Sequence, residues 1–380
     1  MTTNGPAMTK PAQNKLILFL TLKVFSATGG IEKVCRVAGK ALFEYGLKNN
    51  IPVRVYSMHG PRTGAVKNKY FPTEIFRGFN SARTKFVIRS VLTGRKSHTV
   101  ILSHINLLLA GWLIKKLRPS VNLILIAHGI EVWKPLSRRH KMMLRSCDHI
   151  VSVSRFTADK IKELHGIAPE KLGVLNNCID PFLEMPEETG RNSELMKRYG
   201  FAADDIILLT LTRLSEKDRY KGYDYVLQSM QELIRENKKI KYLLAGSYSE
   251  GEKEYIDGLV DKLGIGANVV LSGYVKEDEL PAHFSLADIY VMPSVKEGFG
   301  IVFVEAMYYG VPAIAANADG SVDALLNGQL GLLIEPADPK AITVAIKKML
   351  ADRNKYIPDH DLLMEHFGYE HYKEELEAII

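Results

Sequence analysis

The chain contains the stretch DIYVMPSVKEGFGIVFVEAM, residues 288–307, in which an apolar run, a glycine-rich turn and a second apolar run follow one another. The first run, 288–294, is short and rich in Ile, Val and Met, which is typical of a strand buried in a parallel sheet. The second run, from about Gly300, has the composition of a helix. A buried strand that leads through a tight turn into a helix is the repeating unit of α/β proteins, and it predicts that fold class.

The same alternation of short apolar runs and amphipathic segments fills the rest of the chain. The predicted strands are 15–21, 52–57, 99–104, 122–128 and 149–154 in the first half, and 206–212, 241–247, 268–275, 288–294, 312–316 and 331–336 in the second. Between about Pro181 and Asp205 the pattern breaks in a segment that gathers proline, glycine and acids. We therefore expect two doubly wound, Rossmann-like domains, 14–182 and 200–365, that face a central cleft.

Composition limits the class of protein. The chain has 380 residues, of which 46% are hydrophobic and 24% charged, and this excludes disordered and fibrous proteins. Its three cysteines lack metal-binding spacing and suit a reducing compartment. The N-terminus is polar, and no apolar run approaches the roughly 18 residues that a membrane span needs. We expect a cytoplasmic protein.

Positive charge is concentrated in the first half of the chain. Between Arg62 and Arg145 there are seventeen Lys or Arg residues and two acids, Glu74 and Glu131. Such a block indicates an anionic partner, which can be lipid headgroups, a phosphorylated acceptor or nucleic acid. No recognition-helix or RNA-binding motif supports the nucleic-acid alternative.

Two glycines, Gly29 and Gly30, follow the first predicted strand and precede a helix that starts near Ile31. Glycine lets the backbone approach a ligand closely, and a helix N-terminus presents free N–H groups to an anion. The pair is a candidate phosphate-facing loop. A plain strand-to-helix turn is the alternative, because the full spacing of a dinucleotide-binding motif is missing.

Two cations stand at the opening of the second half. Arg213 ends a predicted strand, and Lys221 follows eight residues later, just before Gly222 and a predicted helix. Positive side chains at the carboxyl edge of a sheet, beside a helix N-terminus, form a cradle for a diphosphate leaving group. Taken singly, each would more often be a solvated surface charge.

Two glutamates, Glu297 and Glu305, enclose the turn of the stretch 288–307, and neither has an obvious partner nearby in the sequence. The two acids can hold different parts of one elongated ligand, because eight positions correspond to about 12 Å of helical rise. A carboxylate is the natural acceptor for vicinal hydroxyls such as those of ribose. The free backbone amides between them belong to Gly298, Phe299 and Gly300. For Glu305 a capping or ion-paired helix acid is the alternative.

His128 ends another predicted strand, just before Gly129, and its position should point it at the cleft. A lone histidine is nevertheless more often structural. We find no zinc spacing, no nucleophile elbow and no carboxylate cluster, so metal-independent chemistry is expected.

Together these motifs resemble those of the retaining glycosyltransferases of family 4, which have the GT-B fold. The resemblance rests on TGG (28–30), HG (128–129), SRFTADKI (154–161), TRLSEKDRYKGYD (212–224), LLAGS (243–247), VVLSGYV (269–275) and EGFGIVFVEAM (297–307). It covers nearly the whole chain. The pair of glutamates with seven residues between them is the best-known feature of that family.

The resemblance implies a role for each candidate residue. Arg213 and Lys221 would bind the donor diphosphate, Gly29 and Gly30 would form a close-approach loop, and Glu305 would accept the ribose hydroxyls. Glu297, with the amides of Gly298, Phe299 and Gly300, would lie at the donor sugar. His128 would lie beside the reacting centre. The base would lie near Gly273, Tyr274 and Val275. In such enzymes the acceptor attacks from the face that the phosphate leaves, without an enzymic nucleophile.

The resemblance also divides the work between the domains. Residues 14–182 would bind the acceptor and 200–365 the nucleotide sugar, while the last segment, 366–380, is similar to a helix that packs back on the N-terminal domain. No metal, and no cofactor besides the nucleotide-sugar donor substrate, is implied.

RYKG (219–222) together with HGIEVW (128–133) narrows the likeness to bacterial exopolysaccharide α-mannosyltransferases. These enzymes move mannose from GDP-mannose onto a cellobiose unit carried on a polyprenyl diphosphate. A family 4 transferase that uses a UDP-sugar, with glucose or N-acetylglucosamine, is the alternative. A sugar-nucleotide epimerase of the same architecture is a further alternative, and it would need no acceptor site.

A lipid-linked acceptor would explain the basic block between Arg62 and Arg145. Segment 79–92 can act as an interfacial helix that docks on the anionic inner face of the plasma membrane, which would make the protein peripherally membrane-associated. Its expected apolar side is Phe79, Phe86, Val87 and Val91, and its expected basic neighbours are Arg83, Lys85 and Arg89. The alternative is an amphipathic helix that packs on its own sheet with a solvated basic rim.

Overall fold

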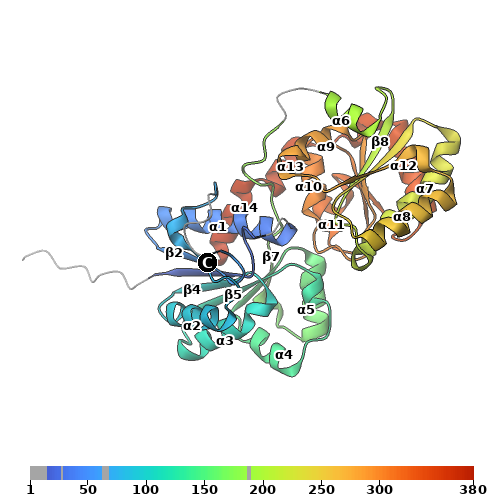
Figure 1. The fold of residues 1–380 in the computed structure, drawn as a ribbon. Coiled ribbons are helices and arrows are strands. Elements are labelled where there is room, and N and C mark those ends of the chain that lie inside the picture. The colour runs from blue at the N-terminus through green and yellow to red at the C-terminus, as the bar shows by residue number, and fades with distance from the viewer. Residues whose placement is uncertain (1–14, 27–28, 62–67, 186–189) are drawn as a thin grey trace, which may run out of the picture.

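A computed structural model of the protein describes residues 15–26, 29–61, 68–185 and 190–380. Four parts of the sequence interpretation lie outside these residues: the polar N-terminus, Thr28 of the TGG motif, the start of the basic block at Arg62, and residues 186–189 of the segment between the predicted domains. The described residues form two domains, each built around a parallel sheet with helices on both faces (Figure 1). The predicted α/β fold class is therefore confirmed.

The N-terminal domain has, in its described part, a sheet of order β3-β2-β1-β4-β5-β6-β7 in which every pairing is parallel. The strands are β1 (Ile17–Thr21), β2 (Val53–Ser57), β3 (Phe76–Gly78), β4 (Thr99–Leu102), β5 (Asn122–Ala127), β6 (His149–Ser152) and β7 (Leu172–Val174). The surrounding helices are α1 (Gly30–Lys48), α2 (Arg83–Gly94), α3 (Leu108–Leu117), α4 (Arg138–Arg145) and α5 (Arg155–His165).

Alternation along β1 explains how this sheet is covered on both faces. Ile17 and Phe19 belong to the core that includes α1, whereas Leu18 and Leu20 belong to the core under α2 and α3. Successive side chains of a strand point to opposite faces, so a continuous apolar run is what a doubly covered strand requires.

The C-terminal domain repeats this arrangement with the order β10-β9-β8-β11-β12-β13. Its strands are β8 (Ile206–Leu211), β9 (Ile240–Ala245), β10 (Val269–Gly273), β11 (Ile289–Met292), β12 (Ala313–Ala316) and β13 (Gly331–Ile334). Its helices are α6 (Ser193–Tyr199), α7 (Tyr223–Glu236), α8 (Glu250–Leu263), α9 (Leu280–Leu286), α10 (Ile301–Tyr308), α11 (Ser321–Ala324), α12 (Pro339–Ala351) and α13 (His360–Phe367). In both sheets the strand order reverses beside the first strand of the domain, and ligands of such folds bind at that switch point.

The last helix, α14 (Tyr369–Ile379), lies on the N-terminal domain beside α1 (Figure 1). The Tyr369 hydroxyl donates to Glu44 Oε2 at 2.8 Å, and Lys48 pairs with Glu377 at 3.0 Å. The preceding α13 packs on α10 of the C-terminal domain, where the Phe367 ring contacts Phe299. The chain therefore crosses between the domains twice.

All eleven predicted strands are confirmed, with boundaries that differ by a few residues. Two strands were missed, β3 and β7. Each has three residues and lies at a sheet edge, so neither carries a long apolar run that the sequence could reveal. Within the described ranges, no helix has both the length and the apolar character needed to cross a bilayer.

The prediction for segment 79–92 was wrong in one respect. Phe79 and Phe86 do not form an outward apolar side: both are buried in the core of the domain, and their rings contact each other in a T-shaped arrangement. Val87 and Val91 pack against the same core. The apolar side of α2 is therefore covered by the protein's own sheet and α3.

Candidate active site

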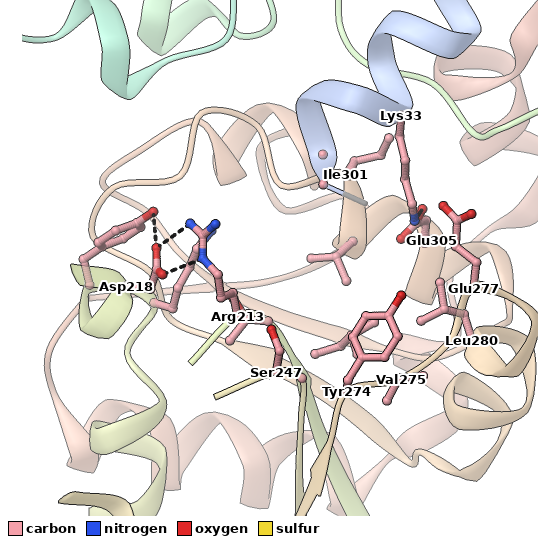
Figure 2. A pocket seen from close by; sticks show the side chains of 18 residues that line it. Lys33, Arg213, Asp218, Ser247, Tyr274, Val275, Glu277, Leu280, Ile301 and Glu305 are labelled. Carbon is pink, nitrogen blue, oxygen red and sulfur yellow. Dashed lines mark hydrogen bonds and ion pairs between the residues drawn. The ribbon is translucent and has the colours of Figure 1, made fainter. Parts of the chain in front are cut away.

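A cavity of about 360 Å³ lies between the two domains at the carboxyl ends of β8 and β10 (Figure 2). Seven of the residues predicted from the sequence to contact the ligand line it: Gly29, Gly30, Arg213, Lys221, Tyr274, Val275 and Glu305. Figure 2 shows Tyr274 and Glu277 toward one end, Glu305 with Lys33 beside them, and Arg213 toward the other end. Residues from both domains thus surround one elongated space.

The start of α1 forms the N-terminal wall of the cavity. Gly29 is the N-cap residue and offers no side chain to the first turn, so that turn's N–H groups have no side-chain cap. A Cβ placed on Gly30 would come within 4.0 Å of Ile301 at the start of α10. The N-terminus of α1 is thereby brought close to the C-terminal domain. The predicted start of a helix near Ile31 is confirmed.

Arg213 follows β8 and presents a largely exposed guanidinium to the cavity. Its Nε and Nη2 donate to the two carboxylate oxygens of Asp218 at 2.7 and 3.1 Å, which fixes the plane of the guanidinium. Lys221 ends a short 3₁₀ helix just before Gly222, whose φ of +79° is accessible to glycine. The two predicted cations therefore face the same cavity.

Glu297 and Lys221 form an ion pair in which both side chains are mostly buried. Burial opposes the charge on Lys221, but the adjacent Glu297 carboxylate outweighs this effect and raises the pKa of the ammonium. Glu297 begins the turn into α10, and Gly300 at φ +84° completes it. The helix start near Gly300 is confirmed.

Glu305 lies in the second turn of α10, and its side chain is only 4% exposed. Its partner comes from the other domain: Lys33 Nζ donates to Glu305 Oε1 at 2.5 Å. Burial of a carboxylate without a partner would be costly, and the ion pair with Lys33 offsets this cost. Neither glutamate of the pair is unpartnered, and both partners are lysines distant in sequence.

His128 lies at the domain interface but does not line the cavity. Its ring is buried, and Nε2 donates to the Ser103 carbonyl at 2.8 Å. Burial lowers the pKa of the imidazole, which favours the neutral form. The backbone around Gly129 packs so closely on Gly298 that a Cβ on Gly129 would lie 2.7 Å from the Gly298 Cα.

Phe299 contributes only its backbone to this region, because its side chain is buried in the core against Phe367. The turn 297–300 is thus held between the two domains. His128 is brought to the edge of the site, with its ring turned toward Ser103.

Sequence reasoning missed three residues that line the cavity, Lys33, Asp218 and Glu277, and one that lies outside it and bonds the backbone of Glu297, Asp319. Lys33 lies one helical turn after Gly30, and Glu277 follows Val275 closely, so each stood near a motif that had been recognised. Asp319 comes just after the predicted strand 312–316, where the carboxyl end of a parallel strand could have marked it.

Two family models match the chain. Residues 28–182 match the model described as Glycosyltransferase Family 4, and residues 192–361 match the model described as Glycosyl transferases group 1. The chain belongs to glycosyltransferase family 4. The resemblance inferred from the sequence motifs is confirmed.

Relatives of this family 4 glycosyltransferase include a GDP-mannose-dependent α-(1-6)-phosphatidylinositol monomannoside mannosyltransferase from Mycolicibacterium smegmatis. It is 29% identical over 238 residues, which are 59% of this chain and 60% of the relative. The mannosylfructose-phosphate synthase of Agrobacterium fabrum is 26% identical over 225 residues, 57% of this chain and 48% of that protein. The matches thus span about half to three fifths of the length of these relatives.

Among solved structures, Anabaena Alr3699/HepE in complex with UDP is similar to this glycosyltransferase with a TM-score of 0.74 and 19% sequence identity. The match covers 95% of this chain and 98% of the Anabaena chain. This likeness establishes the GT-B fold.

Proposed function

We propose that the protein is a retaining hexosyltransferase that moves α-mannose from GDP-mannose onto a lipid-linked saccharide. The observation that carries this proposal is one cavity in which a buried carboxylate, Glu305, two cations, Arg213 and Lys221, and the uncapped start of α1 face the same space. A nucleoside diphosphate offers hydroxyls to the carboxylate and phosphate oxygens to the cations and amides.

Glu277 favours guanine at the base end. Its carboxylate lines the cavity beside the exposed ring of Tyr274, and Arg36 Nη2 donates to Glu277 Oε1 at 2.7 Å. Guanine presents two adjacent donors, the N1–H and the 2-amino group, to one carboxylate. Uracil presents a single N–H between two carbonyl oxygens, and a carboxylate would repel these two oxygens. The name of the mycobacterial relative also supports GDP-mannose as donor.

Departure of the diphosphate is assisted by fixed positive charge. Arg213 and Lys221, which line the cavity, neutralise the leaving oxygens. Glu297, which pairs with Lys221, holds the sugar beside them. The acceptor hydroxyl then attacks from the face that the phosphate leaves, so the configuration at the anomeric carbon is kept. Neutral His128, at the edge of this turn, contributes through its backbone position.

A basic, partly apolar surface supports a polyprenyl-diphosphate acceptor of exopolysaccharide biosynthesis at the inner face of the plasma membrane. The sequence has no acid between Ile75 and Ile130. The exposed apolar residues of α2 and α3 are Ile88, Leu92, Leu109 and Leu117. Large side chains exposed among lysines and arginines match an anionic lipid surface.

A thermal-shift panel with GDP, UDP and ADP tests the donor. A ligand bound only by the folded protein raises the melting temperature, and GDP should do so most. Glu305→Ala should weaken the binding of all three nucleotides. Glu277→Gln should reduce the preference for GDP over UDP about tenfold, because one charged hydrogen bond is lost.

Transfer is measured by release of GDP from GDP-mannose with and without a lipid-linked acceptor. Release that depends on acceptor supports a transferase and contradicts an epimerase. Stronger stabilisation by UDP than by GDP would contradict the proposed donor and favour the UDP-sugar alternative.

A further inference from the structure

Asp319 is a buried carboxylate outside the donor cavity. It follows β12 and is 1% exposed. Its Oδ2 accepts the backbone N–H of Glu297 at 2.6 Å, and its Oδ1 accepts the backbone N–H of Ser321 at 2.9 Å. No lysine or arginine in the described part of the chain forms a salt bridge with it. Two peptide N–H groups therefore stabilise its charged form, together with the adjacent Ser321 hydroxyl.

The loop that carries Asp319 also holds the Glu297 turn through its backbone. Gly320 N donates to the Glu297 carbonyl at 2.8 Å, so Glu297 is bound on both sides of its peptide. A Cβ on Gly320 would collide with the carbonyl oxygen of Gly298. On the opposite side, a Cβ on Gly298 would collide with the carbonyl oxygen of His128. The turn is fixed between the Asp319 loop and the N-terminal domain.

A carboxylate is an expensive way to hold a turn. Burial raises the pKa of Asp319 to about 7, because desolvation disfavours its charged form and the nearby Glu297 charge adds to this effect. What the carboxylate provides is a pair of charge-assisted hydrogen bonds with fixed geometry, stronger than a neutral acceptor would form.

We propose that Asp319 is a positioning residue for the donor sugar, which acts by fixing the backbone of Glu297. This inference rests on the proposed function. The Glu297 carboxylate and the amides of Gly298 and Gly300 are set in place relative to Lys221, the cation at the leaving group. A misplacement of about 1 Å in such a constellation costs roughly 100-fold in rate.

Contacts to the nucleoside should not depend on Asp319. The residues that face the nucleoside, Glu305, Glu277 and Tyr274, lie on α10 and after β10, and Asp319 forms no hydrogen bond with them. The role therefore predicts a separation: affinity for GDP, which has no sugar, stays the same, while steps that involve the sugar are impaired.

Asp319→Asn tests this separation, because asparagine keeps one acceptor oxygen and presents an amino group to the other peptide N–H. We expect GDP affinity within about twofold of wild type and kcat for transfer from GDP-mannose reduced about 10-fold to 100-fold. Asp338→Asn is the matched control, because it makes the same change in another carboxylate that accepts a backbone N–H, that of Lys340 at the start of α12, and it should resemble wild type.

Hydrogen exchange of the backbone amides of 295–300 provides a readout that is independent of activity. It should be faster in Asp319→Asn and unchanged in Asp338→Asn. Unchanged exchange, unchanged kcat, or a parallel loss of GDP affinity and kcat would each overturn the positioning role. Failure of the proposed function is a different result: wild-type protein would neither bind GDP nor transfer mannose, whatever the exchange data show.

Discussion

Glu305 and Lys33 form a buried ion pair between residues that lie 272 positions apart. The pair has a double effect on a nucleotide sugar. The Lys33 ammonium offsets the cost of burying the Glu305 carboxylate, but it also occupies one oxygen that the ribose hydroxyls would use. The donor must therefore share the Glu305 carboxylate with the Lys33 ammonium of the other domain, or partly displace that ammonium.

Lys33→Met should destabilise the protein by about 3 kcal/mol, because it leaves the Glu305 carboxylate buried without a partner. Urea denaturation measures the effect. Lys48→Met is the control on the same helix: Lys48 is 69% exposed in its pair with Glu377, and the loss should stay below about 1 kcal/mol.

The double variant Lys33→Met/Glu305→Gln should recover part of that stability, since no buried charge remains. If the stability losses of Lys33→Met and Glu305→Gln simply add in the double variant, the ion pair does not stabilise the protein as described.

The helices show what periodicity can and cannot predict. The pattern of α2 correctly indicated one apolar side, but periodicity does not tell whether a sheet or a lipid covers that side. Phe86 proved to be in the core. The residues left outside, Ile88 and Leu92, did not stand out in the sequence because they interrupt the predicted basic side.

Ile88→Glu and Leu92→Glu should therefore lower binding to anionic vesicles several-fold without affecting the fold, because each adds a negative charge to a basic, exposed surface. Vesicle co-sedimentation at low and physiological salt measures this. Phe86→Glu provides the contrast, since a charge in the core should unfold the domain. Vesicle binding equal to wild type in both exposed variants would contradict membrane docking through α2.

Much of the architecture could be predicted from the sequence, because buried parallel strands carry unbroken apolar runs. The positions of Arg213, Lys221 and Glu305 followed from strand ends and glycine turns. Three other residues did not. Lys33, Glu277 and Asp319 take their places through contacts between segments that are distant in the sequence, so the motifs and the strand end beside them do not reveal which side chains or backbone groups they meet.

Considered as a whole, the molecule closes a highly charged space with parts of both domains: Lys33, Arg213 and Lys221 line it together with Asp218, Glu277 and Glu305. The start of α1 comes from one domain, and Arg213 and Lys221 come from the other. In the described ranges, His, Cys, Asp and Glu form no cluster of three or more that could hold a metal ion. Metal-independent transfer, as predicted from the sequence, stays a prediction, in which these cations and amides neutralise the diphosphate.

Transfer should accordingly be unchanged within about twofold after EDTA treatment, because side-chain charge at the leaving group does not depend on a removable ion. The assay is GDP release in the presence of acceptor. Activity that is abolished by EDTA and restored by Mn²⁺ would show that a metal takes part.

The second crossing of the chain between the domains has a consequence for biosynthesis. Tyr372 and Leu376 of α14 complete the core around α1, yet the ribosome makes them after the entire C-terminal domain. Domains generally fold as units in the order of synthesis. Here the N-terminal domain is synthesised first, but the apolar surface of α1 stays uncovered until α14 has been made. A delay late in translation would therefore prolong the exposure of apolar surface in the N-terminal domain.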